Sequence, residues 1–510
     1  MKNWGCSQKT IKSKIMNKEE YERLAAGGYN RIPIVREVLA DTETPLSVYL
    51  KLAKGKHSYF FESVQGGEKW GRYSIIGLPC RTILTVKGNR ITVETDGSIQ
   101  EELVSEEPFD FVAKFKARFN VADAPDDQRF SGGLVGYFSY DTVRFVETKL
   151  GRADNTDDIN TPDVFLMLSE ELVVFDNLRG TISFIINVDP QETGSFKAAQ
   201  VRLDQLQDSL KNPVSLPLFD DGAVLTGKNF EHHFSKPKFE AAVERIKNYI
   251  VAGDVMQVVL AQRMSIDFTE DPIHVYRALR YLNPSPYMVF FDMGDHQVVS
   301  ASPEILARVE AGKITVRPLA GTRKRGESEE EDLALEEDLL ADSKEIAEHL
   351  MLIDLSRNDS GRVSKIGSVK VPRKMFVERY SHVMHIASIV ESEIRDDKNS
   401  LDVLKATLPV GTLSGAPKVR AMQIIDELEP EKRGIFGGAM GYLGWNENMD
   451  MAIAIRTAVV KGGKLYVQAG AGIVADSQAE SEWEETQNKA RAIVLAVELV
   501  EKSLSLDFEN

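Results

Sequence analysis

The amino-acid sequence predicts an α+β protein whose strands form large, mostly antiparallel sheets. Three observations support this fold class. Residues 31–210 contain short runs rich in β-branched and aromatic residues, separated by turn signals. The chain after residue 230 alternates similar runs with amphipathic helical patterns. No repeat of solenoid length and no low-complexity tract is present, so a repeat architecture is not expected.

The expected elements follow one another in two groups. The first half is expected to contain the strands SYFFESV, TILTVKG, RITVETDG, GGLVGYFSYD, LVVFDN and TISFIINV. Residues 210–229 combine prolines and turn residues with little periodicity, so we expect a linker there that divides a region 1–225 from a region 226–510. The second group begins with a helix, FEAAVERIKNYIVAGDV, and continues with the strands MQVVLAQRMSI, YMVFFDM, QVVSAS, GKITVRP, MDMAIAIRTAVV and KLYVQAGAG and helices at 330–356, 402–408, 417–428 and 479–503.

Composition limits the class of protein. The 510 residues carry a formal net charge of −16, which opposes nonspecific binding to nucleic acid or to an anionic membrane. No run approaches about 18 uninterrupted apolar residues, and no signal peptide is evident, so a cytoplasmic protein is expected, with Met1 or Met16 as its start. Cys6 and Cys80 are the only cysteines, which excludes a disulfide framework.

Two glutamate pairs, Glu345/Glu348 and Glu482/Glu485, lie on predicted amphipathic helices, and Asp342 or Ser343 could N-cap the first of them. A spacing of three places both carboxylates of a pair on one helical face, where they could bind a hard divalent cation such as Mg²⁺. In an acidic chain, the same spacing also occurs on solvated helix faces. Lys489 stands four residues after Glu485, a spacing that is equally typical of a surface ion pair.

Two other patterns point away from familiar enzyme classes. The turn VQAGAGIVADS matches G-x-G-x-x-A, but five residues separate its glycines from the next helix, unlike a dinucleotide-binding turn. Gly470 and Gly472 are better explained as positions where backbone N–H groups can approach a ligand carboxylate. The segment GTLSG does not have the order of a serine-hydrolase nucleophile turn.

A series of longer segments then follows in one order: MQVVLAQR, NPSPYM, SASPE, RPLAGTRKRG, KEIAEHLMLIDLSRND, YSHVMH, PVGTLSGAPKVRAMQIID, GAMGYLG, AIRTA, AGAGIVADS and SEWEETQNKA. This series resembles the chorismate-utilising enzyme family across residues 235–500, and most closely its anthranilate-forming branch. YFFESV and GRYSIIG resemble the N-terminal region of the same branch, so the resemblance covers nearly the whole chain. It implies two large, mostly antiparallel sheets packed as a sandwich with helices outside.

The resemblance also implies where the substrate binds. Chorismate carries a ring carboxylate and an enolpyruvyl carboxylate, and the family holds Mg²⁺ between the two glutamate pairs, against the ring carboxylate. Arg456, Lys489 and the amides of Gly470 and Gly472 resemble the groups that hold the enolpyruvyl carboxylate. An arginine suits this purpose because its planar fork matches a carboxylate.

Two residues distinguish among the reactions of the family. Relatives that add water at ring C2 have a lysine base where this chain has Gln257, and glutamine cannot take a proton. Aminodeoxychorismate synthases have a nucleophilic lysine where this chain has Ala320. The resemblance therefore implies amination at C2 with loss of the C4 hydroxyl, then elimination of pyruvate to give anthranilate, the first committed step of tryptophan biosynthesis.

Other roles follow from the matching motifs. Glu304 in SASPE matches the general acid of the family, which requires a raised pKa. His385 matches the active-site histidine, which could take the C2 proton. His349 and His382 are expected to be packing or surface residues. Further substrate contacts are expected from Gly321, Thr322, Thr412 and Tyr442, beside Ala320.

A second site is implied for tryptophan as a feedback inhibitor. Glu62 and Ser63 resemble one half of the inhibitor site of the family, and the stretch NPSPYM resembles the other half, with Asn283, Pro284, Pro286, Tyr287 and Met288 as its expected contacts. Taken alone, these segments would be an ordinary strand and an ordinary turn.

The chain contains no recognisable glutamine amidotransferase module, so ammonia is expected from solution or from a separate glutaminase subunit, in a complex of two large and two small subunits. Three hypotheses about function remain. The first is the anthranilate-forming enzyme, and the second is either an aminodeoxychorismate synthase component or an enzyme that stops at 2-amino-4-deoxyisochorismate. The third is a non-catalytic tryptophan-binding regulator.

Overall fold

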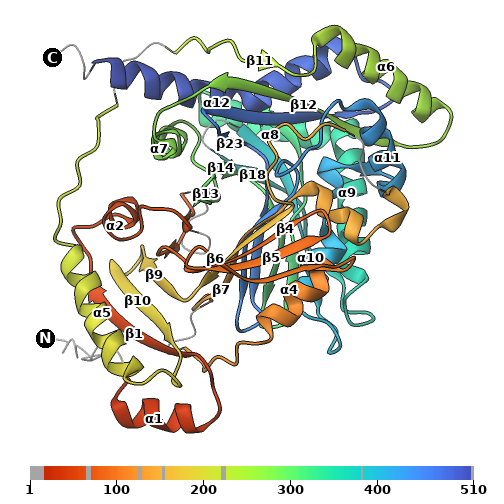
Figure 1. The fold of residues 1–510 in the computed structure, drawn as a ribbon. Coiled ribbons are helices and arrows are strands. Elements are labelled where there is room, and N and C mark those ends of the chain that lie inside the picture. Colours follow the sequence, from red (N-terminus) through yellow and green to blue (C-terminus); the bar gives the residue numbers. More distant parts are fainter. Residues whose placement is uncertain are drawn as a thin grey trace, which may run out of the picture.

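The computed structural model describes residues 16–64, 71–124, 129–151, 155–219, 225–380 and 383–506. Within these ranges the chain forms two sheets of twelve strands each. Every pairing between named strands is antiparallel in the described part, as expected, and Figure 1 shows the helices arranged around the sheets. Met1, Cys6 and His382 lie outside the described residues.

The first sheet joins strands from both halves of the sequence. In the middle of this sheet, β2 pairs with β13, and Met288 lies opposite Glu62. In order across the sheet, the strands are β1 (Ile32–Leu39), β10 (Thr181–Val188), β9 (Glu171–Asp176), β3 (Tyr73–Gly77), β2 (Ser58–Glu62), β13 (Tyr287–Asp292), β14 (His296–Ser302), β23 (Thr457–Lys461), β24 (Lys464–Ile473), β12 (Gln257–Asp267) and β11 (Glu231–His232), with β20 (Gly415–Ala416) also on β12.

The second sheet is also shared between the halves. β21 pairs with β7, so that Tyr442 lies opposite Val135. In order, the strands are β17 (Leu319–Lys324), β19 (Val383–Glu393), β16 (Lys313–Val316), β15 (Ile305–Glu310), β22 (Met449–Ile453), β21 (Ala439–Gly444), β7 (Gly133–Phe138), β8 (Val164–Ser169), β4 (Thr82–Lys87), β5 (Arg90–Thr95) and β6 (Ser98–Val104), with β18 (Lys370–Arg379) also on β19. Both sheets thus contain strands from either side of residue 225.

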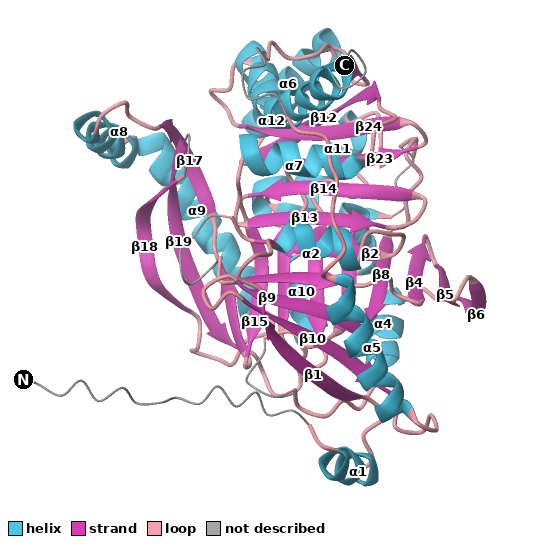
Figure 2. Cartoon of the chain, turned by 90° about the vertical axis from the view of Figure 1, so that its left-hand side faces the viewer, coloured by secondary structure: helices cyan, strands magenta, loops and turns pink. Residues whose placement is uncertain are grey.

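The helices lie outside this pair of sheets (Figure 2). They are α1 (Lys18–Ala26), α2 (Pro45–Leu52), α4 (Pro108–Lys116), α5 (Ser195–Ser209), α6 (Lys236–Val251), α7 (Pro272–Leu282), α8 (Glu329–Ala341), α9 (Ser343–Gly361), α10 (Ser400–Thr407), α11 (Lys418–Leu428) and α12 (Ala479–Leu506), with short 3₁₀ turns at η1 (Tyr140–Phe145), η2 (Thr148–Leu150) and η3 (Gly411–Leu413). Among the described residues, no helix is long and apolar enough to cross a membrane.

Hydrophobic side chains fill three layers. One cluster lies between the sheets and includes Tyr59, Val135, Val289 and Met440, each at most 1% exposed. A second lies between the first sheet and α2, α5, α7 and α12, and a third between the second sheet and α4 and α10. This arrangement is the predicted sandwich with helices outside, in which each sheet has two buried faces.

Two segments that were expected to be single elements are divided in the structure. The run MDMAIAIRTAVV was expected to form one strand, but β22 ends at Ile453 and β23 begins at Thr457, in different sheets. Residues 330–356 were expected to be helical, with Asp342 or Ser343 as a candidate N-cap. The structure divides them into α8 and α9 at Asp342, whose ψ of 106° is not helical. The Asp342 carboxylate accepts hydrogen bonds from the backbone N–H groups of Lys344 and Glu345, at 3.0 and 3.3 Å. This cap begins α9 one turn before Glu348, because it satisfies N–H groups that the first helical turn leaves unpaired.

Candidate active site

Glu304 lies in the turn between β14 and β15, where it is 6% exposed. Burial raises the pKa of its carboxyl to about 8, although Arg317 and Lys489 act in the opposite direction. Its Oε1 has no hydrogen-bond partner in the described part of the chain. The backbone is held in place because Ile453 donates its N–H to the Glu304 carbonyl at 3.0 Å. A carboxyl in this environment keeps its proton at neutral pH, as a general acid must.

A bulge in the strand pair β17–β19 orients His385. Ala320 and Thr322 pair with adjacent residues of β19, so Gly321 is the extra residue of the bulge. Its φ of +66° lies in the left-handed region that favours glycine. The Gly321 carbonyl lies 2.9 Å from His385 Nδ1. Because a carbonyl can only accept, Nδ1 carries the proton and Nε2 keeps its lone pair.

The surroundings of His385 keep its imidazole neutral. Burial lowers the pKa of His385, and the positive charges of Arg456, Arg317 and Lys489 lower it further, whereas the hydrogen bond to Gly321 raises it. Tyr380 packs edge-on against the ring at 5.5 Å between centroids. The result is a neutral imidazole that can accept a proton and that lies among three cations.

The predicted anion-binding residues differ in their present contacts. Lys489 Nζ lies 2.6 Å from Glu485 Oε1, which is the ion pair expected from the spacing, and it donates a hydrogen bond to the Gly470 carbonyl at 2.9 Å. Arg456 has a φ of +50°, a conformation that costs a residue other than glycine roughly 1–2 kcal/mol. No described residue accepts a hydrogen bond from its guanidinium. A partly exposed, unpaired arginine suits a ligand carboxylate.

Gln257 connects β12 to the first glutamate pair. The residue is 5% exposed, and its Nε2 donates a hydrogen bond to Glu348 Oε1 at 3.4 Å. The same amide lies over Gly472 of the neighbouring strand β24, where a Cβ atom would come within 2.5 Å of Nε2. A side chain at position 472 would displace the Gln257 amide, so the glycine leaves room for it in its present position.

The four glutamates lie at the beginnings of two helices, α9 and α12. Burial raises the pKa of Glu345, and the neighbouring Glu348 raises it further. Burial also raises the pKa of Glu482, with a smaller contribution from Glu485. A bound divalent cation would offset both the burial and the mutual repulsion that raise these pKa values. The donor atoms are all carboxylate oxygens, which fits Mg²⁺. In the described chain, these carboxylates do not form a set of three whose oxygen atoms lie within 4.8 Å of one another.

The remaining expected contacts lie around this region. Thr412 belongs to η3, and its Oγ1 is buried without a partner among the described residues. Ala320 is partly exposed on β17, and Thr322 Oγ1 lies 3.1 Å from His385 Nδ1. His349 is fully buried and packs as expected, with Nε2 2.7 Å from Ser388 Oγ.

A separate cavity of about 160 Å³ lies between the two sheets, where β2 meets β13 and β21 meets β7. Its volume is similar to that of engineered cavities that accept an aromatic ring. Five of the expected tryptophan contacts line it, namely Glu62, Ser63, Pro286, Tyr287 and Met288. Asn283 and Pro284 instead form the turn after α7, outside the lining.

Tyr442 lines this cavity too, although a chorismate contact was expected for it. Its ring lies 4.3 Å from that of Phe130, between centroids. The carboxylate of Glu62 is occupied, because Arg280 donates two hydrogen bonds to it, at 2.7 and 2.9 Å, and Tyr276 donates a third at 3.1 Å.

Three charged residues near the two sites were not singled out from the sequence. Arg317 lies close enough to Glu304 and His385 to shift the pKa of both groups. In the cavity, Arg308 donates hydrogen bonds to Asp450, including one of 2.9 Å from Nε. Arg317 begins the segment RPLAGTRKRG, which could have indicated it, whereas Arg308 and Asp450 stand on ordinary strands without a sequence signal.

Comparison with known proteins agrees with this geometry. The sequence profile of the chorismate binding enzymes matches residues 56–495. The chain is 58% identical to anthranilate synthase component 1 of Pseudomonas aeruginosa, over 96% of this chain and 100% of that protein. It is 53% identical to anthranilate synthase component 1 of Neisseria meningitidis, over 96% and 100%. The solved anthranilate synthase component I from Streptococcus pneumoniae is 38% identical and covers 90% of this chain and 99% of its own, with a TM-score of 0.74.

A more distant structure shares the fold alone: the menaquinone-specific isochorismate synthase from Escherichia coli, at 18% identity and a TM-score of 0.68, over 94% of this chain and 98% of its own. The chain belongs to the family of chorismate binding enzymes. Within that family, the relatives that it matches along nearly its whole length are anthranilate synthase components 1.

Proposed function

We propose that this chain is the chorismate-converting subunit of an anthranilate synthase, which aminates chorismate at C2 and then eliminates pyruvate to give anthranilate. Identities of 48–58% to anthranilate synthase components 1 over nearly the full length support this activity. The structural observation that carries the proposal is the buried carboxyl of Glu304, whose raised pKa of about 8 suits an acid that must donate a proton at neutral pH.

In the first half-reaction, ammonia forms a bond to C2, the ring double bonds shift, and the C4–O bond breaks. Glu304 donates its proton to the departing hydroxyl, which leaves as water. A carboxyl with an ordinary pKa would already be ionised at neutral pH and could not do this. The nitrogen bonded to C2 is at first an ammonium and loses one proton to solvent, so the product keeps the enolpyruvyl ether and carries the new amine at C2.

In the second half-reaction, the free Nε2 of His385 takes the proton from C2, and the ether bond at C3 breaks. The ring becomes aromatic, and the enolate that leaves gains a proton at carbon to become pyruvate. Gly321 supports this role because its carbonyl holds the Nδ1 proton in place, so that Nε2 is the basic nitrogen.

Binding of the dianionic substrate would rest on charges of both signs. Arg456 and Lys489 would hold the enolpyruvyl carboxylate, with Gly470 and Gly472 in the adjacent strand β24 and with Gly321, Thr322, Thr412 and Ala320 lining the ring. Glu345, Glu348, Glu482 and Glu485 would hold Mg²⁺, directly or through water. The cation would neutralise the ring carboxylate, which four glutamates would otherwise repel.

The choice of nucleophile would depend on Gln257 and Ala320. The Gln257 amide already donates to Glu348 and has no basic atom with which to activate water. Ala320 stands on the active-site strand β17 without a group that could attack the ring. Ammonia needs no such activation, so these two residues favour direct amination over water addition or a covalent intermediate.

Two further parts of the proposal concern regulation and assembly. The cavity between the sheets would bind tryptophan as an inhibitor, with its indole between Tyr442, Met288 and their apolar neighbours. Ammonia would come from a separate component 2, a glutamine amidotransferase, as the name component 1 of the relatives suggests. A complex of two large and two small subunits is the arrangement that we propose.

One assay tests the reaction. The purified chain is incubated with chorismate, excess Mg²⁺ and ammonium at alkaline pH, while anthranilate fluorescence and pyruvate are followed. Formation of both in equal amounts supports the proposal. An aminated product without pyruvate would indicate an enzyme that stops at the intermediate, and no conversion would indicate a regulator.

A further inference from the structure

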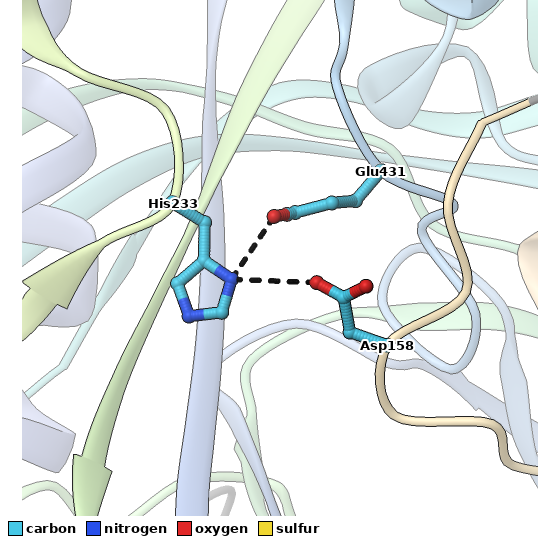
Figure 3. Close-up of side chains that lie close together, drawn as sticks. All are labelled: Asp158, His233 and Glu431. Atoms are coloured by element: carbon cyan, nitrogen blue, oxygen red, sulfur yellow. Dashed lines mark hydrogen bonds and ion pairs between the residues drawn. The ribbon is translucent and has the colours of Figure 1, made fainter.

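Asp158, His233 and Glu431 bring three ligand atoms together at a distance from the proposed active site. His233 Nδ1 lies 2.9 Å from Glu431 Oε1 and 3.8 Å from Asp158 Oδ2, and the three atoms all lie within 4.8 Å of one another. Figure 3 shows the imidazole directed toward both carboxylates. From this geometry we propose a binding site for one borderline divalent cation of the Zn²⁺ class, with these three side chains as ligands.

The distances suit such an ion. Bonds of about 2.0–2.2 Å in tetrahedral geometry place neighbouring ligand atoms roughly 3.3–3.6 Å apart. The separations of 2.9 and 3.8 Å from His233 Nδ1 lie on either side of that range, and the two carboxylate oxygens lie within 4.8 Å of each other, so side-chain shifts within reach of exposed Asp158 complete the site. One imidazole and two carboxylates favour Zn²⁺ or Co²⁺ over Mg²⁺, which prefers oxygen ligands alone.

The ligands are held in place by backbone contacts among three separate segments. His233 donates its N–H to the Arg263 carbonyl at 3.0 Å, which fixes it beside β12. The segment around Asp158 is bound to that of Glu431, because Lys432 donates its N–H to the Thr156 carbonyl at 2.9 Å. Arg263 Nη1 lies 3.7 Å from Glu431 Oε2, which leaves Oε1 directed at His233.

The second nitrogen of the imidazole also has a partner. His233 Nε2 lies 2.9 Å from Oγ of Ser265, a residue of β12 that is 1% exposed. When Nδ1 binds a metal, Nε2 must carry the proton and can donate it to this hydroxyl, which is the outer-shell contact typical of metal-bound histidines. The chain of Ser265, His233 and Glu431 also has the order of a hydrolase triad, but so deeply buried a hydroxyl cannot reach a substrate.

The site is open to solvent on one side and separate from the proposed active site. The side chain of Asp158 is 46% exposed, whereas those of His233 and Glu431 are 15% and 10% exposed, so a water can complete the coordination. Ser265 and Gln257 stand eight residues apart on β12, which corresponds to roughly 26 Å along a strand. Asp158 comes from the first half of the chain and the other two ligands from the second, so a bound ion would join them.

Titration of the full-length, chelator-treated chain with Zn²⁺ in excess Mg²⁺ tests this site. Calorimetry should show one Zn²⁺ per chain, and Co²⁺ should give a visible absorption band of a four- or five-coordinate ion. Asp158→Asn and His233→Ala should abolish both signals. Ser265→Ala keeps all three ligands and should weaken Zn²⁺ binding roughly 10–100-fold.

His232→Ala is the matched control, because the neighbouring imidazole contacts Gln262 instead and its loss should leave the stoichiometry unchanged. Circular dichroism of each variant separates loss of ligand from loss of fold, and the half-exposed position of Asp158 makes its variant the safest. The proposal is overturned if the wild-type chain takes up no more Zn²⁺ than Asp158→Asn and His233→Ala, or if all variants bind it equally.

Discussion

His385 and Gly321 face each other across the strand pair β17–β19, with Nδ1 of the imidazole 2.9 Å from the glycine carbonyl. The glycine presents this carbonyl because it is the extra residue of a bulge and has a left-handed backbone. The orientation of the histidine therefore depends on a backbone conformation in the neighbouring strand, and substitution of the glycine can test it.

Gly321→Ala should lower kcat about tenfold or more. The left-handed φ costs alanine roughly 1 kcal/mol, and the new Cβ would lie 3.0 Å from Leu339 Cδ1 and 3.2 Å from Glu345 Oε2, so the bulge and its carbonyl should move. Gly462→Ala is the control, because it has a similar φ of +60° and open space around it. Both variants should lose stability in urea, but only Gly321→Ala should lose turnover. Equal kinetics in the two variants would contradict the role assigned to this bulge.

Glu304→Gln should reduce kcat roughly 10²–10⁴-fold with little change in chorismate affinity. Glutamine has the shape of the neutral acid and can still donate a hydrogen bond, but it cannot transfer a proton. Steady-state kinetics and direct binding of chorismate, measured separately, distinguish the two effects. Turnover within about threefold of the wild type would remove Glu304 from the mechanism.

The pH dependence of kcat/KM should reflect the titration of the Glu304 carboxyl. Since the folded-state pKa of Glu304 is raised to about 8, its protonated fraction, and with it kcat/KM, should fall as the pH rises above that value. The assay must hold the concentration of free NH₃ constant, because ammonium itself loses its proton in this range. A profile that stays flat across this range would contradict the prediction.

The free energy of unfolding should also fall as the pH rises, because of the same carboxyl. The folded state binds the Glu304 proton more tightly than the unfolded state, so stability is fully present below the ordinary glutamate pKa and falls as the pH rises toward 8. Urea midpoints compared at about pH 6 and about pH 9 should differ more in the wild type than in Glu304→Gln, which cannot titrate.

Glu348→Gln and Glu482→Gln should each raise the Mg²⁺ concentration needed for half-maximal activity, by about tenfold or more. Each change removes one anionic oxygen from the donor set that fits a hard cation. Glu484→Gln is the matched control, since this exposed residue lies on α12 between the two glutamates of the second pair. If all three variants respond to Mg²⁺ alike, the metal binds elsewhere.

Ser63→Phe should abolish inhibition by tryptophan while anthranilate formation continues. The added ring would occupy part of the 160 Å³ cavity, which has room for about one aromatic side chain. In the wild type, tryptophan and chorismate should weaken each other's binding by the same factor, because coupling between two sites is reciprocal. Retention of inhibition in Ser63→Phe would place the inhibitor outside this cavity.

Much of the fold could be predicted from local patterns. Short runs rich in β-branched and aromatic residues, such as TILTVKG and TISFIINV, became β4 and β10, since this local composition needs no information from elsewhere in the chain. The order of strands within each sheet could not be predicted in this way, because pairings such as Met288 with Glu62 join residues far apart in sequence. The cap at Asp342 could be predicted locally, because a short acidic side chain before a helical pattern is a typical N-cap, and the structure confirms that it begins α9.

The site residues likewise divide into those that local motifs predict and those that only tertiary contacts bring together. Glu304 and His385 stand in recognisable motifs, and the pKa shift expected for Glu304 is present because its turn is buried. Arg308 and Asp450 have no such signal, since they stand on ordinary strands and meet only in the folded chain. The ligand set of Asp158, His233 and Glu431 comes from three distant segments with no spacing that a motif could capture.

The cavity between the sheets occupies the seam at which the first half of the chain is joined to the second, once through β2 and β13 and once through β7 and β21. A shortened chain that escaped inhibition by discarding its first half would also leave two strands with unpaired backbone edges, which invite aggregation. With tryptophan bound at this seam, as proposed above, control by an end product and the completeness of the fold would be inseparable, and freedom from inhibition would arise by substitution at the seam but not by truncation.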